Sequence, residues 1–270
     1  MAATWVSVVP TFRPPPEVVT LVSILAESAP VIVSDDASPC TFDGTLRQLK
    51  DISRVTVIRN AHNRGIGRAL NQGWKHAQRA GASWLLTVDQ DSLLDKNYAR
   101  ILVDYADACV ASGFIIGAIG SGDVKDASGP LTYPLRTVIE GNTTVQVTEE
   151  VVQSGTLWSV PGLEHIGGFT ESFGMDAVDA AACLALRSQG HVIAVHPGVT
   201  LEHRIEGAQQ VRILGRDVMV TGHSRARRTA IVRNRLRLFP HEFRLSPRHA
   251  VRTVRRSLMN VAAMPLRRRR

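Results

Sequence analysis

Residues 84–92 read Trp-Leu-Leu-Thr-Val-Asp-Gln-Asp-Ser, a short apolar run that stops at two carboxylates. Apolar residues with β-branched members over such a length predict a buried strand. Side chains alternate faces along an extended chain, so Asp89 and Asp91 are expected on the same side of the strand's end. The stretch therefore predicts a buried strand with an acidic terminus.

Two neighbouring carboxylates repel each other unless a positive charge lies between them. Mg²⁺ and Mn²⁺ prefer oxygen ligands and leave coordination positions for substrate phosphates, so a divalent cation fits the pair. A calcium loop is excluded, because Leu94 stands where the sharp turn needs glycine and Arg100 where the loop needs a bidentate glutamate. Two aspartates alone are also compatible with a solvated acidic turn, so the metal hypothesis needs support from other stretches.

Strands and helices alternate over the first half of the chain. Apolar runs at residues 4–9, 31–33 and 55–58 predict strands, and residues 17–28 carry the apolar spacing of a helix. A glycine-bearing loop at 60–67 opens a second helix. This order predicts an α/β domain whose central sheet is mostly parallel and flanked by helices.

The second half predicts shorter elements: strands at 114–120, 191–195 and 199–201, and a loop-rich segment at 121–142. Two glycines and a phenylalanine at 167–169 precede a loop and then a helix. Asp176 and Asp179 stand three residues apart at the entrance of this helix, close enough to share a face. Capping and a favourable charge in the first turn are the structural alternative for this pair.

The composition supports one large domain with an appendage. Of 270 residues, 44% are hydrophobic, and three widely spaced cysteines fit a reducing compartment better than a disulfide framework. The first nine residues lack the charged and apolar regions of a signal peptide, and the sequence offers no apolar run long enough to span a membrane. We therefore expect a cytoplasmic protein.

The net charge of +8 is concentrated at the C-terminal end, where residues 247–270 hold eight arginines and no acid. This distribution argues against a globally basic nucleic-acid binder and predicts a near-neutral domain over 1–240 with a basic tail over 241–270. In the tail, Val251, Val254, Leu258 and Val261 form an apolar stripe at helical spacing. Such a basic amphipathic helix either lies in a membrane interface, here the inner face of the plasma membrane, or packs on the domain.

Taken together, several stretches resemble the family 2 inverting glycosyltransferases with the A-type glycosyltransferase fold, in the rhamnosyltransferase-like branch. They run in family order from residue 6 to about 238: VSVVPTFRP, VIVSDDASP, NRGIGRALNQGWKHAQRAGASWLLTVDQDS, GGFTESFGMDAVDAAACLALRSQGHVIAVHPG, LEHRIEG and HSRARRTAIVRNRL. The resemblance implies a single nucleotide-sugar-binding catalytic domain and strengthens the metal hypothesis.

The resemblance also implies roles for individual residues. Nucleotide and sugar contacts would come from Thr11, Arg13, Asp35, Asp36, Asn63, Gly65, Asn71 and Asp89, with Arg228 and Arg233 as candidates for the diphosphate. Asp89 and Asp91 would bind Mg²⁺ or Mn²⁺, with His203 completing the metal site. Asp179 matches the family's catalytic base, with Asp176 beside it. The family usually has an acidic residue and a tryptophan just after the base, where this chain has Ala181 and Ala182.

The implied reaction moves a sugar from a nucleotide-diphosphate donor to a glycan or polyprenyl-linked acceptor in cell-surface polysaccharide synthesis. L-rhamnose from dTDP-rhamnose is the leading donor, with galactofuranosyl and N-acetylglucosaminyl transfer as alternatives. A cation and arginines receive the charge that develops on the leaving diphosphate, and a carboxylate takes the proton of the attacking hydroxyl. No nucleic acid partner is expected.

Three other functions compete with glycosyl transfer. Rossmann dinucleotide binding is disfavoured, because Gly65 and Gly67 lack the third glycine of the fingerprint and follow the third predicted strand, not the first. A nucleotidylyltransferase would need a glycine-rich basic loop after the first strand, where this chain has Pro-Thr-Phe-Arg-Pro-Pro-Pro. A non-catalytic binder of anionic membrane or nucleic acid through the basic tail remains an alternative.

Overall fold

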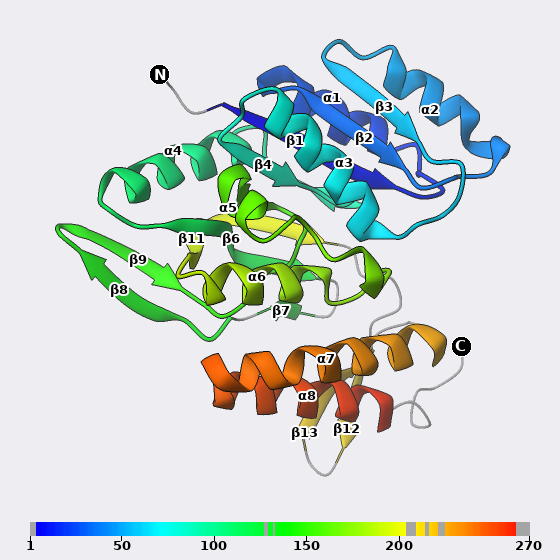
Figure 1. Cartoon of the computed structure of the whole chain (residues 1–270). Helices are drawn as coiled ribbons and strands as arrows, with labels where there is room; N and C mark the ends of the chain where they lie inside the picture. Colours follow the sequence, from blue (N-terminus) through cyan, green and yellow to red (C-terminus); the bar gives the residue numbers. More distant parts are fainter. Residues whose placement is uncertain are drawn as a thin grey trace.

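A computed structural model describes residues 4–126, 129–131, 133–203, 209–213, 216–220 and 225–262. One large mixed sheet runs through the molecule in the strand order β3-β2-β1-β4-β10-β6-β11-β9-β8, with helices on both faces (Figure 1). Two short strands pair beside this path, β5 (Ser92–Leu93) with β11 and β7 (Gly129–Leu131) with β6.

The first half of the sheet is parallel, as the alternation of strands and helices predicts. Its strands are β1 (Trp5–Thr11), β2 (Val31–Asp35), β3 (Val55–Arg59) and β4 (Trp84–Thr87). The connecting helices are α1 (Val18–Ser28), α2 (Asp43–Lys50) after the short 3₁₀ turn η1 (Cys40–Phe42), and α3 (Ile66–Arg79). The apolar stripe expected on the first helix is confirmed, because Val18, Leu21, Val22 and Leu25 are all buried.

The second half mixes strand directions. The strand β10 (Thr156–Ser159) runs antiparallel to both β4 and β6 (Ile116–Asp126), whereas β6 is parallel to β11 (Val192–His203). A hairpin of β8 (Arg136–Glu140) and β9 (Thr143–Val147) closes this edge. The helices here are α4 (Tyr98–Ala111), α5 (Val160–His165) and α6 (Val178–Ser188), with the 3₁₀ turn η2 (Glu171–Phe173) before α6.

Two predictions for this half need correction. The segment 121–142, expected to be loop-rich, contains the end of β6 together with β7 and β8. The two short strands expected at 191–195 and 199–201 are one strand, β11, with an irregular register between His196 and Thr200.

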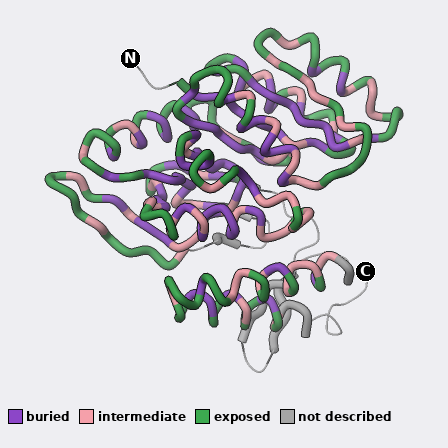
Figure 2. The backbone as a smooth tube through the Cα atoms, viewed as in Figure 1, coloured by how far each residue is buried: buried purple, intermediate pink, exposed green. Residues whose placement is uncertain are grey.

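The core consists of two apolar layers on opposite faces of the sheet. Alternation along β1 shows the division, because Trp5 and Val9 belong to the layer under α1 and α4, while Val6 and Val8 belong to the layer under α3, α5 and α6. The second layer contains Trp158, which is fully buried. Figure 2 shows buried residues concentrated along the central strands.

The C-terminal part begins with the hairpin β12 (Gln209–Ile213) and β13 (Arg216–Val220), followed by helices α7 (Arg225–Leu245) and α8 (Pro247–Ala262). These helices pack against each other, and α7 also contacts α6 (Figure 1). The domain limit predicted at residue 240 falls inside α7, which continues through Pro240. Within the described part of the chain, no helix has both the length and the apolar character needed to cross a bilayer.

Candidate functional site

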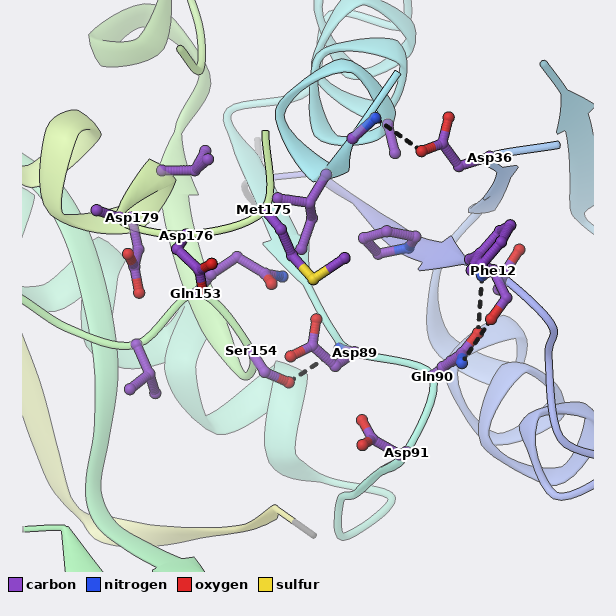
Figure 3. A pocket seen from close by; sticks show the side chains of 18 of the residues that line it. Phe12, Asp36, Asp89, Gln90, Asp91, Gln153, Ser154, Met175, Asp176 and Asp179 are labelled. Carbon is purple, nitrogen blue, oxygen red and sulfur yellow. Dashed lines mark hydrogen bonds between the residues drawn. The ribbon is translucent and has the colours of Figure 1, made fainter. Parts of the chain in front are cut away.

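A cavity of about 460 Å³ opens at the carboxyl ends of β1, β2 and β4. Ligands of open α/β sheets bind at this edge, and the volume is ordinary for a small-molecule site. Many of the predicted site residues line it: Thr11, Asp36, Asn63, Gly65, Asp89, Asp91, Asp176 and Asp179. Figure 3 shows Asp36 and Phe12 on one side, Asp176 and Asp179 on the other, and Asp89 between them.

The acidic motif lies on a turn and not on the strand itself. The strand β4 ends at Thr87, and the backbone N–H of Ser92 donates to the carbonyl of Asp89 at 3.1 Å. The argument from alternating faces therefore does not apply, although both carboxylates line the cavity. The hydroxyl of Ser154 accepts the backbone N–H of Asp89 at 2.9 Å and contacts the hydroxyl of Ser92 at 2.7 Å, which fixes the turn against the loop before β10.

Gln90, between the two aspartates, is a residue that the sequence analysis missed. Its side-chain amide donates to the carbonyl of Phe12 at 3.1 Å, and its side-chain oxygen accepts the backbone N–H of Phe12 at 3.1 Å (Figure 3). This reciprocal pair joins the acidic turn to the loop after β1. Because both segments line the cavity, Gln90 joins two of its walls.

Asp36 organises the wall opposite the predicted base. Its carboxylate accepts the backbone N–H groups of Arg64 at 2.8 Å and Gly65 at 2.7 Å, and the side-chain amide of Asn60 at 3.2 Å. Two backbone donors and an amide therefore hold this carboxylate against the loop that opens α3. The arrangement also positions Asn63, which lines the same wall.

Asp35 is fully buried and is not among the residues that line the cavity. Its carboxylate accepts from the hydroxyl of Thr11 at 3.3 Å and from the backbone N–H of Ser38 at 3.0 Å. These contacts tie the ends of β1 and β2 together. The side chain of Arg13 is exposed, with its guanidinium 5.1 Å from the ring centre of Phe12, and it does not line the cavity either.

The glycines of the Gly65-Ile-Gly67 stretch allow the start of α3 to pack closely against the 170–174 loop. A methyl group on Gly65, whose φ is +84°, would lie 2.7 Å from the carbonyl oxygen of Gly174, and one on Gly67 would lie 2.6 Å from that of Thr170. Only residues without a side chain allow α3 to approach the 170–174 loop this closely. That loop leads into Asp176, so these glycines set the position of the far wall.

Asn71 holds the same loop from a buried position outside the cavity lining. Its side-chain oxygen accepts the backbone N–H of Phe169 at 2.8 Å, and its side-chain amide donates to the carbonyl of Phe169 at 2.9 Å and to the carboxylate of Glu171 at 2.9 Å. Its position identifies Asn71 as a structural clamp between α3 and the loop before α6.

The far wall combines two carboxylates with groups from α7. The guanidinium of Arg227 donates to Asp176 at 3.2 Å, and the side-chain amide of Asn234 donates to the carbonyls of Phe173 at 2.9 Å and Asp176 at 3.0 Å. Between the carboxylates, Ala177 has a φ of +64°, in the left-handed region that a residue with a side chain rarely adopts. Such local strain persists only where surrounding contacts hold it, and here α7 supplies those contacts.

The electrostatics of this wall centre on Asp179. Burial raises the pKa of its carboxyl, and Glu150 raises it further, whereas the guanidinium of Arg235 on α7 and the backbone N–H of Ala180 lower it. Arg235 also pairs with Glu150 at 2.5 Å. Burial alone would raise the pKa of Glu150, but the guanidinium of Arg235, with His249 3.7 Å from the carboxylate, holds that pKa well below its usual range.

The structure places the predicted arginines differently from the sequence analysis. Arg227 lines the cavity, whereas Arg228 is buried outside the lining and Arg233 is exposed on α7. Helical periodicity explains the difference, because neighbouring positions on a helix point in directions about 100° apart. The arginine-rich run itself gave no signal for which member faces the site.

A divalent cation fits the acidic turn. Asp89 and Asp91 offer two carboxylates beside cavity space, and Mg²⁺ is commonly held by one or two carboxylates with water and substrate phosphates around it. Among the side chains that the structure describes, no three or more histidine, cysteine, aspartate or glutamate residues gather as a metal cluster. The backbone of His203 pairs with Ser92, next to Asp91, but its side chain lies outside the described residues.

The fold and the cavity are those of an α/β protein that binds a small molecule at the carboxyl ends of its parallel strands, and comparison with known proteins identifies it as a glycosyltransferase. The chain belongs to glycosyl transferase family 2, whose sequence model matches residues 8–152, more than half of its length. It is also similar to the dTDP-rhamnosyl transferase RfbF of Shigella flexneri, with 28% identity over 211 residues that cover 76% of this chain and 68% of RfbF.

Solved glycosyltransferase structures share the fold. GalNAc-T7 with UDP, GalNAc and Mn²⁺ matches with a TM-score of 0.61 and 14% identity, over 88% of this chain and 48% of that one. Mannosyltransferase PcManGT from Pyrobaculum calidifontis, with GDP-Man and Mn²⁺, gives a TM-score of 0.56 and 15% identity, over 100% of this chain and 77% of PcManGT. TarS of S. aureus gives a TM-score of 0.55 and 17% identity, over 75% of this chain and 37% of TarS. The chain thus spans less than half the length of the TarS and GalNAc-T7 chains.

Proposed function

We propose that the protein transfers L-rhamnose from dTDP-rhamnose, with inversion at the anomeric carbon, to a glycan or lipid-linked acceptor in cell-surface polysaccharide synthesis. One observation carries the reaction type: a single cavity has the Asp89–Asp91 turn on one wall and Asp179 on another (Figure 3). The choice of donor is supported by the similarity to RfbF, whose name specifies a dTDP-rhamnosyl donor.

On the donor side, Asp89 and Asp91 would hold Mg²⁺ or Mn²⁺ together with the diphosphate. When bound, the cation would neutralise the negative charge that develops on the leaving nucleotide. The loop held by Asp36 and the loop held by Gln90 would receive the base and ribose, because they form the cavity wall nearest the ends of β1 and β2.

On the acceptor side, Asp179 acts as the general base. The attacking hydroxyl has a high pKa and must lose its proton as the bond to the anomeric carbon forms, so a positioned carboxylate is required. Burial, by raising the pKa of Asp179, makes it a stronger base than an exposed aspartate, while the charge of Arg235 favours its ionised form. Arg227 keeps Asp176 engaged, which leaves Asp179 as the carboxylate for proton transfer.

The first experiment measures hydrolysis of a panel of nucleotide-sugars by the full chain, with and without Mn²⁺. We expect turnover of dTDP-rhamnose that depends on the metal. Faster turnover of UDP-galactofuranose or UDP-N-acetylglucosamine would contradict the assignment of rhamnose as the transferred sugar. Equal turnover with and without a chelator would contradict the proposed dependence on a divalent cation.

A second experiment tests the acidic turn by calorimetry with dTDP. The Asp91→Ala variant should lose Mn²⁺-dependent binding, because it removes one of two carboxylates offered to the cation. Asp95→Ala is the matched control, since Asp95 is exposed on the segment that follows the turn and does not line the cavity. Unchanged affinity for dTDP in Mn²⁺ after Asp91→Ala would contradict the assignment.

A further inference from the structure

The helices α7 and α8 form a layer beyond the cavity wall, joined at Ser246 (Figure 1). The face that α8 turns inward is small and polar, because His249, Ala250, Thr253 and Ser257 are its buried residues. The hydroxyls of Thr253 and Ser257 donate to backbone carbonyls of the same helix, so polar atoms on this buried face have partners. The helix α8 therefore packs on the rest of the protein through its polar side.

Several large apolar residues of both helices are exposed. Val251 and Leu258 on α8 are each 51% exposed, and Leu236 and Phe243 on α7 are 50% and 46% exposed. The members of each pair are seven residues apart, which is two turns and therefore the same side of a helix. On α7 this side is opposite Arg227 and Asn234, which face the cavity wall. Of the predicted stripe, Val251 and Leu258 are thus exposed, Val254 is half-buried, and the side chain of Val261 lies outside the described residues.

Positive charge surrounds these apolar residues. Phe243 and Val251 line a common surface hollow with Arg248, Arg252 and Arg255. Between residues 227 and 259, the part of both helices whose side chains are described, the only acidic residue is Glu242, which is buried and paired with Arg187 at 2.8 Å. We call the surface formed by Leu236, Phe243, Val251, Leu258, Arg248 and Arg255 the basic apolar face.

We propose that the basic apolar face docks the protein on an anionic phospholipid bilayer. Exposed apolar side chains between arginines match the two parts of such a surface, since the apolar groups enter the acyl boundary and the guanidinium groups contact phosphates. A second copy of this chain fits poorly, because isologous pairing would place like charges against each other. This proposal concerns where the protein acts and does not depend on which sugar it transfers.

Co-sedimentation of the full chain with vesicles tests the proposal. We expect binding to vesicles of phosphatidylglycerol and phosphatidylcholine, little binding to phosphatidylcholine alone, and weaker binding at high salt. Each basic residue near such a surface contributes about 1 kcal/mol, so Arg248→Gln with Arg255→Gln should weaken the partition coefficient by about 25-fold. Val251→Ser with Leu258→Ser should weaken it about tenfold or more, because it removes the inserted apolar area.

The double variant Arg136→Gln with Ile139→Ser is the matched control. It removes one exposed arginine and one exposed apolar residue from β8, away from both helices, and should bind vesicles like the parent chain. Thermal melting verifies that every variant is folded. The proposal is overturned if the parent chain does not bind anionic vesicles, or if both helix variants bind as it does. It is also overturned if the helix variants abolish self-association in sedimentation velocity or binding to a DNA duplex while leaving vesicle binding intact.

Discussion

Replacing Arg235 with methionine should both destabilise the protein and change the pH dependence of catalysis. Arg235 donates to Glu150 at 2.5 and 3.3 Å, and the two side chains are only 16% and 18% exposed. The same guanidinium lowers the pKa of Asp179, the proposed base. Methionine preserves most of the volume of the arginine stem but removes its charge and its hydrogen bonds.

The stability loss follows from leaving Glu150 without its principal partner. Breaking a buried ion pair from one side costs about 3–5 kcal/mol, and the lower end applies here because His249 and Arg256 remain 3.7 and 3.6 Å from the carboxylate. For a chain of this length, about 3 kcal/mol corresponds to a fall of about 5 °C in Tm. In the parent protein the pair stabilises the fold above the ordinary pKa of a glutamate, and acidification toward the depressed pKa of Glu150 removes that contribution.

The substitution of Arg235 should shift the pH dependence of catalysis in one direction. Asp179 must be ionised to accept a proton, so activity is lost as pH falls below its pKa. Removing the charge of Arg235 leaves burial and Glu150 to raise that pKa, so the acid limb of kcat/KM should move to higher pH and activity should recover at alkaline pH. The double variant Arg235→Met with Glu150→Gln removes both opposing charges, and its acid limb should move back toward that of the parent enzyme.

The measurement is a pH profile of kcat/KM for dTDP-rhamnose with thermal melting of each variant. Arg237→Met is the matched control, because Arg237 is exposed two residues further along α7. A fall in Tm without movement of the acid limb would show that Arg235 serves only the fold. An equal shift in Arg237→Met would refute the proposed local coupling to Asp179.

Three further substitutions probe separate walls of the cavity. Asp179→Asn keeps the side-chain shape but cannot accept a proton, so transfer should fall by about 10²–10⁴-fold while calorimetric affinity for dTDP-rhamnose is retained. Gly67→Ala places a methyl group 2.6 Å from the carbonyl oxygen of Thr170, and the resulting overpacking should lower the free energy of unfolding in urea by about 1–3 kcal/mol and reduce transfer. Gln90→Leu removes both hydrogen bonds to Phe12, and the looser donor wall should raise KM for dTDP-rhamnose more than it lowers kcat.

Each of these three predictions can be contradicted by a specific result. Normal transfer by Asp179→Asn would move the role of base to Asp176. Gly44→Ala is the control for Gly67→Ala, because no atom lies within 4 Å of the added methyl group; equal effects of the two would reject the packing argument. An unchanged KM in Gln90→Leu would show that the pair with Phe12 does not shape the donor wall.

The parallel half of the fold follows from local signals. Apolar runs separated by helical stripes specify alternating elements, and the stripe on α1 is buried as periodicity requires. The far edge of the sheet lacks such a signal. The strand β8 is mostly exposed, without a period of two, so its sequence resembles a loop and its structure depends on pairing with β9.

Residue types at the cavity were more predictable than residue positions. Two aspartate pairs are recognisable in sequence, Asp89 with Asp91 after a strand and Asp176 with Asp179 at a helix entrance, and all four residues line the cavity. Gln90 and Phe12 are 78 residues apart in the sequence, and no local sequence pattern predicts the hydrogen bonds between them. The choice of Arg227 depends on the rotation of α7 about its axis, which tertiary packing determines.

If the basic apolar face contacts a membrane, α7 would also set the distance between that membrane and the cavity. One side of it carries Arg227 and Asn234 against the cavity wall, and the opposite side presents Leu236 and Phe243. A helix with its side chains is about 10 Å across, so a bilayer contacting the outer side would lie about one helix diameter from the cavity wall that Arg227 lines. An acceptor sugar would have to extend about that far from a lipid head group to reach the cavity, whereas the tip of a long glycan would have to bend back toward it. The thickness of α7 would therefore set the distance between the membrane and the cavity, and that distance would favour short acceptors whose sugars lie close to the membrane.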